Sequence, residues 1–284
     1  MNRMVNRTRL RWWRGEYRGT ICRFKDGEIV CDDALNFLNA LEEECADVIF
    51  VDPPFNLGKK YGKRSKKKDC VEESIYSEYM TNVLKRGVQV LKTGGTLYLY
   101  HLPIWALRFG NILEEEGLSF RHWIAISMKN GFVRGNHLHP AHYALLYFTK
   151  GKPNYFSRPK IDIAKCRHCG KDIKDYGGYK KYVKDGINLS DYWEDISPVR
   201  HKKYKYREEN ELPISIVSRV INISGVKGGL VVDPFIGTGS VLDAAKSKKM
   251  NFVGADIEKK FLNIAKTRLS KRDSIDKKKR NKNE

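Results

Sequence analysis

Long apolar runs are scarce in this sequence, and their scarcity excludes several classes of protein. No stretch approaches the roughly 18 consecutive apolar residues of a membrane-spanning helix. The N-terminus, MNRMVNRTRLRWWRGEYRG, lacks the apolar centre of a secretory signal. We therefore expect a cytoplasmic protein with no membrane partner.

Cysteine is also sparse. The six cysteines are scattered along the chain, so a disulfide framework is not expected in a reducing compartment. Only CRHCG has metal-like spacing, and its Cys166 and Cys169 supply two ligands, whereas a structural zinc normally takes four. We expect no bound metal. A zinc site at this pair, within one chain or shared between two, stays the alternative.

Acidic residues are few relative to basic ones, 34 against 54, and the formal net charge is +20. This excess is larger than solubility requires and indicates a polyanionic partner, with nucleic acid as the first candidate. A chain of 284 residues without an internal repeat can bury one core domain that carries a substantial insertion. We expect that organisation here.

The stretch FVDPPFNLGK places a carboxylate, two prolines and an aromatic ring where an apolar run stops. Residues 46–51 are mostly apolar and rich in β-branched side chains, which predicts a buried strand of a parallel sheet. Asp52 then lies at the carboxyl end of that strand, where open α/β sheets bind ligands. Pro53 and Pro54 fix the backbone and leave its carbonyls available as acceptors. For this stretch alone, a rigid loop with Asp52 as a turn former is the alternative.

A second segment, GGLVVDPFIGTGSVLDAAKSKKMNFVGADI, predicts a strand, a glycine turn, a helix and a second strand ending in Asp256. The spacing from Gly239 to Asp256 is close to the roughly 20 residues at which an acid meets a ribose. The third glycine of the dinucleotide fingerprint is absent and no phosphate loop follows, which favours a phosphate-free nucleoside. Asp233 would attract an ammonium group. S-adenosylmethionine combines a ribose with such a group.

Together the two motifs resemble those of the β-class amino-methylating DNA methyltransferases. Residues 52–55 are similar to the family's Asp/Ser-Pro-Pro-Tyr/Phe, and residues 233–239 to its Asp-Pro-Phe-x-Gly-x-Gly, in the permuted order that marks the class. The resemblance covers residues 20–150 and 190–270. It implies an α/β fold with a doubly wound, mostly parallel sheet of the S-adenosylmethionine-dependent methyltransferase type and an inserted DNA-recognition region.

The resemblance also implies a set of cofactor-binding residues. CDDALNFL is similar to the family's Gly-Asp-x-Leu element, in which Asp33 would reach the cofactor adenine, and Asp32 stands where the family has glycine. NELPISIVSRVI, residues 210–221, resembles the helix that closes over the methionine part. The expected cofactor-binding residues are Asp33, Asp233, Pro234, Phe235, Gly237, Thr238, Gly239, Ser240, Asp256 and Ile257.

The chemistry of the first motif follows from its target. The exocyclic amine of adenine or cytosine is a poor nucleophile because its lone pair is delocalised into the ring. If Asp52 and the carbonyl of Pro53 each accept one N–H, the nitrogen is oriented toward a sulfonium methyl. Such a base must leave the duplex, and Phe55 would stack on it, with a buried core position as the alternative for this ring. We expect the catalytic residues to be Asp52, Pro53, Pro54 and Phe55.

The resemblance implies a site-specific DNA methyltransferase acting on adenine N6, because aspartate at the first motif position usually accompanies adenine in the family. Cytosine N4 methylation, RNA methylation and an inactive DNA-binding relative of the fold are the alternatives. A nucleotide-dependent oxidoreductase is disfavoured by the missing third glycine. Expected partners are double-stranded DNA and a cognate restriction endonuclease, with the protein a monomer or a homodimer.

The segment between the motifs predicts the rest of the sheet. VLKRGVQVLKTGGTLYLYHL is typical of a helix, a turn and a strand, and FRHWIAISMKN and HYALLYFTKGK of two further strands. His101, His139 and His142 lie in this segment. We expect structural roles for them, since methyl transfer to an amine needs no general base beforehand.

Basic segments outside the motifs are expected to contact DNA. We expect a basic arm at 1–19, a catalytic half at 20–150, an inserted target-recognition region at 151–207, a cofactor-binding half at 208–270 and a basic tail at 271–284, with arm and tail disordered in isolation. The cationic loop at 58–69 suits phosphates, with a merely solvated loop as the alternative. The candidate DNA-binding residues are Lys59, Lys60, Lys66, Lys67, Lys68, Arg200, Lys202 and Lys203.

Overall fold

A computed structural model gives the fold of the chain. The residues that it describes are 12–15, 17, 19, 21–56, 59–60, 68–69, 71–128, 136, 138, 140–163, 165–166, 168–172, 186–196 and 211–280, with 59–60, 68–69 and 273–280 described by their backbone alone. These residues build one large sheet, six helices and two short hairpins. None of the helices described is both long enough and apolar enough to span a membrane.

The large sheet has nine strands in the order β1-β2-β13-β12-β3-β6-β8-β7-β11. From β2 to β6 all neighbouring strands are parallel, whereas β8 runs antiparallel to β6 and β7, and β1 antiparallel to β2. The central strands are apolar and buried, as in sheets covered by helices on both faces. Their bounds are β1 Ile21–Arg23, β2 Gly27–Cys31, β3 Ala46–Val51, β6 Leu91–His101, β7 Ser119–Ser127, β8 His142–Thr149, β11 Tyr192–Trp193, β12 Leu230–Asp233 and β13 Asn251–Asp256.

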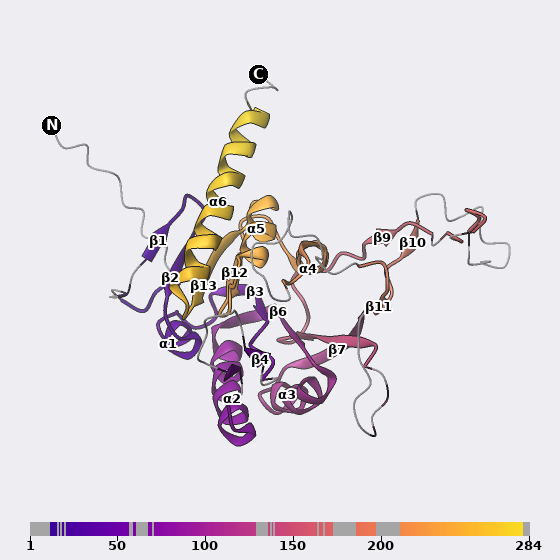
Figure 1. Ribbon diagram of the computed structural model, residues 1–284. Coiled ribbons are helices and arrows are strands. Elements are labelled where there is room, and N and C mark those ends of the chain that lie inside the picture. Colours follow the sequence, from indigo (N-terminus) through magenta and orange to yellow (C-terminus); the bar gives the residue numbers. More distant parts are fainter. Residues whose placement is uncertain are drawn as a thin grey trace.

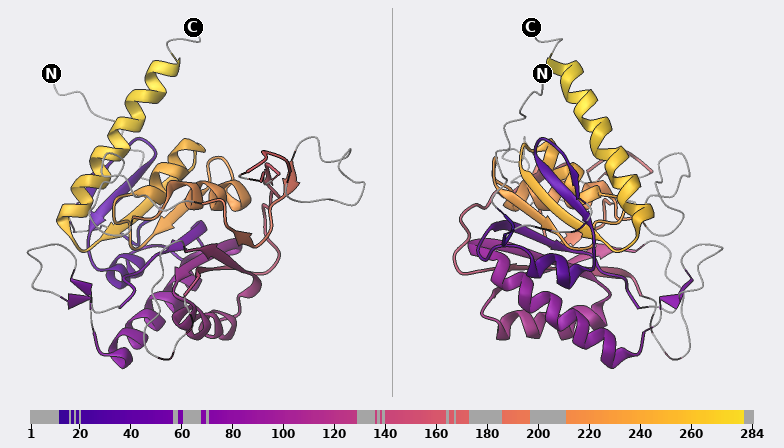
Figure 2. Two further views of the ribbon diagram at one scale, coloured as in Figure 1. Left: turned by 45° about the vertical axis from the view of Figure 1, so that its right-hand side comes forward. Right: turned by 90° about the vertical axis from the view of Figure 1, so that its left-hand side faces the viewer.

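Helices cover both faces of the sheet (Figures 1 and 2). One layer packs Phe37, Met80 and Phe109 into a core with the sheet, and the other packs Val217, Leu242 and Leu269. The fold is therefore α/β and doubly wound, as the sequence predicts. The first layer is α1 (Ala34–Asn39), α2 (Glu73–Val90) and α3 (Pro103–Glu115), and the second is α4 (Ile214–Ser224), α5 (Ser240–Ser247) and α6 (Lys259–Arg280).

Two short hairpins lie outside the large sheet. One pairs β4 (Lys59–Lys60) with β5 (Lys68–Asp69), in the cationic segment that follows the catalytic motif. The other pairs β9 (Lys160–Ile161) with β10 (Ile187–Asn188), in the predicted recognition region. Figure 1 shows β9 and β10 beyond α4, away from the sheet. This hairpin of the inserted region thus lies to one side of the core.

Two segments that we expected outside the core are instead packed against it. Trp193, in the predicted insertion, is 1% exposed, pairs with β7 through β11, and lies under the guanidinium of Arg219 at 4.8 Å. Trp13, in the predicted arm, donates from Nε1 to Glu28 at 2.5 Å and packs edge-on against Phe37. Large aromatic side chains gain enough from burial to order both segments locally. The expected disorder of the arm is therefore wrong for residues 12–15, which the structure describes.

The C-terminal tail also departs from the prediction. The sequence indicates disorder over 271–284, but α6 continues to Arg280. Lysine and arginine are good helix formers, and Arg272 anchors this part of the helix by donating from Nε to Asp243 of α5 at 2.9 Å. The end of α6 consequently projects beyond the sheet (Figure 2). Residues 281–284 lie outside the described part of the chain.

Candidate active site

Four carboxylates lie at one edge of the sheet. Asp52 follows β3, Asp233 ends β12, Asp256 ends β13, and Asp33 follows β2 by two residues. These strands are parallel neighbours, so their carboxyl ends meet at the same edge. The helices that follow β3 and β12 cover opposite faces, which makes this the topological switch point where open α/β sheets bind ligands.

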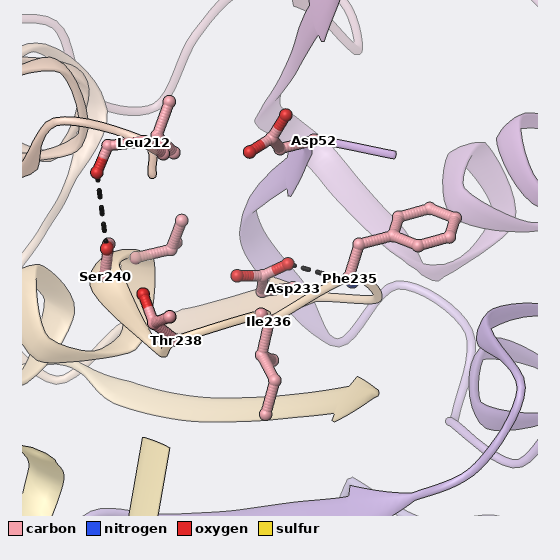
Figure 3. A pocket seen from close by; sticks show the side chains of 9 residues that line it. Asp52, Leu212, Asp233, Phe235, Ile236, Thr238 and Ser240 are labelled. Atoms are coloured by element: carbon pink, nitrogen blue, oxygen red, sulfur yellow. Dashed lines mark hydrogen bonds between the residues drawn. The ribbon is translucent and has the colours of Figure 1, made fainter. Parts of the chain in front are cut away.

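A cleft lies at this switch point. Asp52 and Asp233 face it from neighbouring strands, and Leu212, in the segment before α4, borders its other side (Figure 3). The hydroxyl of Ser240 donates to the Leu212 carbonyl at 3.4 Å and so ties that segment to the glycine turn. Both predicted motifs therefore contribute to one cavity. Its lining is Asp52, Leu212, Asp233, Phe235, Ile236, Gly237, Thr238, Ser240 and Val241.

The loop after β3 is held from below. Pro53 is buried, whereas Pro54 is exposed and its carbonyl accepts a hydrogen bond from the hydroxyl of Tyr76 at 2.7 Å. Phe55 is half-buried, stacks on His101 with ring centroids 4.9 Å apart, and also packs against Tyr143. Asp52, the first residue of the predicted catalytic tetrad, thus lines the cleft, and Phe55, the last, lies among aromatic rings.

Asn56 closes the segment that follows the tetrad. Its backbone has φ +53°, a left-handed conformation that asparagine tolerates. Its side-chain amide donates to the carbonyl of Val71 at 3.0 Å and accepts from the backbone N–H of Val71 at 2.8 Å. One side chain therefore clasps the two ends of the cationic loop beside Phe55, a feature that sequence reasoning missed.

His101 lies at the end of β6, beneath Phe55. It is fully buried, and burial lowers the pKa of its imidazole to about 3. Burial therefore favours the neutral form of the ring at physiological pH. His142 begins β8, and His139 lies outside the described residues.

The glycine turn after β12 brings backbone close to the cleft. Gly237 and Gly239 both have left-handed backbone angles, φ +48° and +79°, and a Cβ at Gly239 would lie 2.9 Å from the Cβ of Ala265. Asp256 accepts from the backbone N–H of Gly237 at 2.9 Å and of Glu258 at 2.8 Å. The predicted ribose acid is thus also a brace for the turn.

Asp233 is the most buried of the four carboxylates, at 1% exposed. Burial raises its pKa well above the usual range, and the nearby Asp52 and Asp256 raise it further, against the N–H of Phe235, which lowers it. A cation in the cleft would favour the charged form of Asp233.

A buried arginine supports the glycine turn from behind. Arg268 of α6 donates from Nη1 to the hydroxyls of Ser240 at 2.9 Å and Thr238 at 3.3 Å. It also pairs with Glu211 at 3.4 Å and Asp243 at 3.3 Å. In sequence Arg268 belongs to an ordinary basic helix, so no local signal indicated this role.

The remaining predicted site residues have mixed positions. Asp33 caps α1 through the N–H of Leu35 at 2.9 Å and accepts from the hydroxyl of Tyr79 at 2.7 Å. Pro234 is buried, and Ile257 is 67% exposed at the same sheet edge. The side chains of Lys59, Lys60 and Lys68, and all of Lys66, Lys67, Arg200, Lys202 and Lys203, lie outside the described structure.

The CRHCG segment forms a turn. The N–H of Gly170 donates to the Cys166 carbonyl at 2.9 Å, and the N–H of Cys166 to the Lys171 carbonyl at 2.7 Å. Cys169 is exposed. Within the described ranges, no group of three or more His, Cys, Asp or Glu residues could hold a metal ion.

Comparison with known proteins identifies the family. The sequence of the chain matches the family model of the N6/N4 methyltransferases, whose description is DNA methylase. The match covers residues 46–267, which include both motifs and most of the sheet. The chain belongs to the N6/N4 DNA methylase family. The family resemblance predicted from the two motifs is thereby confirmed.

Two type II methyltransferases illustrate the range of similarity within this DNA methylase family. M.BamHI from Bacillus amyloliquefaciens is 38% identical over 249 residues, which are 87% of this chain and 58% of that protein. M.HpaI from Haemophilus parainfluenzae is 30% identical over 257 residues, 88% of this chain and 78% of that protein. The chain thus spans less than two thirds of the length of M.BamHI.

Two solved structures share the fold of this chain. The complex of M1.HpyAVI with SAM has a TM-score of 0.58 at 18% identity and covers 86% of this chain and 98% of that one. The cytosine-N4-specific PvuII DNA methyltransferase has a TM-score of 0.61 at 16% identity and covers 86% of both chains. Both show the same arrangement of sheet and helices as this DNA methylase.

Proposed function

We propose that the protein transfers a methyl group from S-adenosylmethionine to the exocyclic amine of a base in double-stranded DNA. The observation that carries the proposal is that Asp52 and Asp233 face one cleft from neighbouring strands (Figure 3). An acceptor for an amine and a carboxylate for a cofactor ammonium thus lie side by side. Family membership and the +20 charge support the same substrate.

The residues of the cleft fit S-adenosylmethionine. Gly237 lines the cleft with a left-handed backbone and no side chain, which allows a ligand to approach the backbone, and the buried Asp233 suits its ammonium. Asp256 ends the next strand, where its carboxylate lies at the same sheet edge and can accept hydrogen bonds from ribose hydroxyls. Asp33 is the proposed partner of the adenine, with Pro234, Phe235, Thr238, Ser240 and Ile257 completing the site. When bound, the cofactor supplies an electrophilic methyl group.

The catalytic loop orients the nucleophile. Asp52 and the carbonyl of Pro53 each accept one N–H of the amine, so that the nitrogen lone pair points toward the methyl group. Positive charge develops on the nitrogen as the new bond forms, and Asp52 stabilises it. Phe55 stacks on the flipped base and replaces part of the stacking that the duplex loses.

Adenine N6 is the proposed target, because aspartate leads the catalytic motif. The structural similarity to the cytosine-N4-specific PvuII enzyme keeps cytosine N4 as the second candidate. Expression in a methylation-deficient host, followed by mass spectrometry of nucleosides and sequencing of modified sites, tests the choice. N6-methyladenine at one short sequence is the expected product. If N4-methylcytosine were found instead, the target would be cytosine and not adenine. Unmodified DNA would overturn the proposed methyltransferase function.

The pH dependence of cofactor binding tests the role of Asp233. In the free protein the raised pKa of Asp233 favours its protonated form. The cofactor ammonium favours the charged carboxylate, so cofactor binding releases a proton from Asp233. Affinity should therefore rise with pH, by up to about tenfold per unit, until the pH passes the pKa of Asp233 in the free protein. Calorimetry from pH 5 to 7, in buffers of different ionisation enthalpy, measures both affinity and proton release. Asp233→Asn should abolish the slope. If the parent protein bound the cofactor equally well at pH 5 and at pH 7, Asp233 would not be the partner of the cofactor ammonium.

The cationic loop is proposed to clamp phosphates. Replacing Lys66, Lys67 and Lys68 with glutamine should weaken binding to every duplex and reduce the salt slope by about 0.9 per lost contact. Binding is measured on specific and scrambled duplexes across a salt series. The matched control replaces Lys227, Lys248 and Lys249, three exposed lysines at the opposite end of β12 and β13, and should leave the slope nearly unchanged. If both triple variants weakened binding and lowered the salt slope equally, the effect of the loop would come from net charge alone, and the proposed phosphate clamp would be wrong.

We further propose that residues 151–207, including Arg200, Lys202 and Lys203, read the target sequence through base edges. Lys59 and Lys60 would add phosphate contacts beside the catalytic loop. The protein would act in the cytoplasm as a monomer or homodimer, with a restriction endonuclease of the same specificity as its partner.

A further inference from the structure

A continuous chain of hydrogen bonds runs beneath the catalytic loop. The backbone N–H of Leu102 donates to Nδ1 of His101 at 2.8 Å, Nε2 of His101 lies 2.7 Å from the hydroxyl of Tyr76, and that hydroxyl donates to the Pro54 carbonyl at 2.7 Å. His101 is 0% exposed and Tyr76 6%. The chain connects the end of β6 and the first turns of α2 to the loop that follows β3.

The geometry fixes the direction of every bond in this chain. A carbonyl accepts only, so the single hydroxyl proton of Tyr76 points to Pro54, and the hydroxyl oxygen must accept from Nε2 of His101. Nδ1 of His101 accepts the amide proton of Leu102, so the neutral ring carries its proton on Nε2. Both arguments assign the same tautomer. The chain therefore has one arrangement of protons.

We propose that Tyr76 and His101 are positioning residues for methyl transfer, an inference that rests on the proposed function of the 52–55 loop. The ring of Pro54 fixes its own φ, so holding the Pro54 carbonyl leaves the preceding peptide little freedom. That peptide carries the Pro53 carbonyl, one of the two acceptors for the amine. The hydroxyl of Tyr76 thus orients the Pro53 carbonyl without contacting it.

His101 acts on the loop at a second point. Its ring stacks on Phe55 at 4.9 Å and 26°, and it orients the hydroxyl of Tyr76. The buried ring of His101 therefore positions the Pro54 carbonyl, through Tyr76, and the ring of Phe55. Tyr76 itself is held edge-on by Trp105 at 4.8 Å, so its hydroxyl has little room to move. The loop is organised before the base arrives, which favours the reactive geometry.

Tyr76→Phe isolates the hydroxyl from the packing of the ring. The variant should lower kcat about tenfold on a duplex containing the mapped site, with KM for DNA and Kd for S-adenosylmethionine within twofold of the parent. The matched control is Tyr98→Phe, which removes an equally buried hydroxyl that bonds Ser224 at 2.7 Å, away from the loop. This control should lose comparable thermal stability and keep kcat within twofold.

A second pair of variants tests His101. Glutamine can place an amide N–H near the position of Nε2, whereas asparagine reaches only as far as Nδ1. His101→Gln should therefore keep a several-fold higher kcat than His101→Asn, although both lose the imidazole. Equal kcat values for this pair would overturn the role of His101.

The outcomes separate this inference from the function on which it rests. A parent-like kcat in Tyr76→Phe, with Asp52→Ala inactive, would overturn the positioning role alone. If Tyr98→Phe lowered kcat as much as Tyr76→Phe does, the loss would reflect general destabilisation of the fold. That result would also overturn the positioning role. Retained activity in Asp52→Ala would overturn the proposed function of the loop, and the inference with it.

Discussion

Asp52→Ala is expected to lower the rate of methyl transfer by about 10²–10³-fold while cofactor affinity stays within about twofold. Asp52 lies at the carboxyl end of β3, on the side of the cleft away from the glycine turn (Figure 3). Its loss removes the acceptor that orients the amine and opposes the charge developing on nitrogen. The turn that would bind the nucleoside is untouched. A radiolabelled methyl assay beside calorimetry measures the two quantities separately.

Asp47→Ala is the matched control for this experiment, because Asp47 lies near the opposite end of the same strand. Its carboxylate accepts from Lys92 at 2.8 Å and from the N–H of Leu230 at 2.7 Å, so its loss should cost about 1–3 kcal/mol of stability and leave the rate intact. If the two variants lost activity in parallel with stability, the catalytic role of Asp52 would be disproved.

Arg268→Met should destabilise the fold by about 3–5 kcal/mol and weaken cofactor binding. The arginine is 8% exposed and bonds to Ser240 and Thr238 in the glycine turn, while Glu211 and Asp243 lie beside it. Removing its charge leaves carboxylates buried with less compensation. Chemical unfolding measures the stability, and titration with S-adenosylmethionine shows whether the turn still binds.

Arg272→Met provides the comparison for Arg268. It removes a more exposed arginine that pairs with the same Asp243 at 2.9 Å but does not reach the turn. The expected cost is about 1 kcal/mol or less, without loss of cofactor affinity. Equal destabilisation by the two variants would show that the contacts of Arg268 with the turn carry no particular weight.

The sequence predicts the parts of the site whose chemistry is local. A strand, a carboxylate and two prolines are consecutive at 46–54, and a strand, a glycine turn and a helix are consecutive at 230–247, so the pattern alone places Asp52 and Asp233 at strand ends. That both face one cleft follows from the adjacent parallel pairing of β3 and β12, which the structure shows.

The supporting residues could not be predicted in this way. Arg268 lies far along the chain from Glu211, and Tyr76 bonds to both Pro54 and His101 only because α2 packs beneath the end of β6. Tertiary packing brings these residues together, and none has a distinguishing neighbour in sequence. The same holds for Trp193, whose two-residue strand is too short to show a period.

The clasp between Asn56 and Val71 has an evolutionary consequence. Because both ends of the intervening segment are joined by one side chain, changes of length within it act mainly through loop-closure entropy. That cost grows slowly, by about 0.6 kcal/mol for each doubling of length. Insertions and deletions between these two residues can therefore accumulate in descendants without displacing the neighbouring Phe55, so the length of the proposed phosphate clamp can diverge while the 52–55 loop keeps its place.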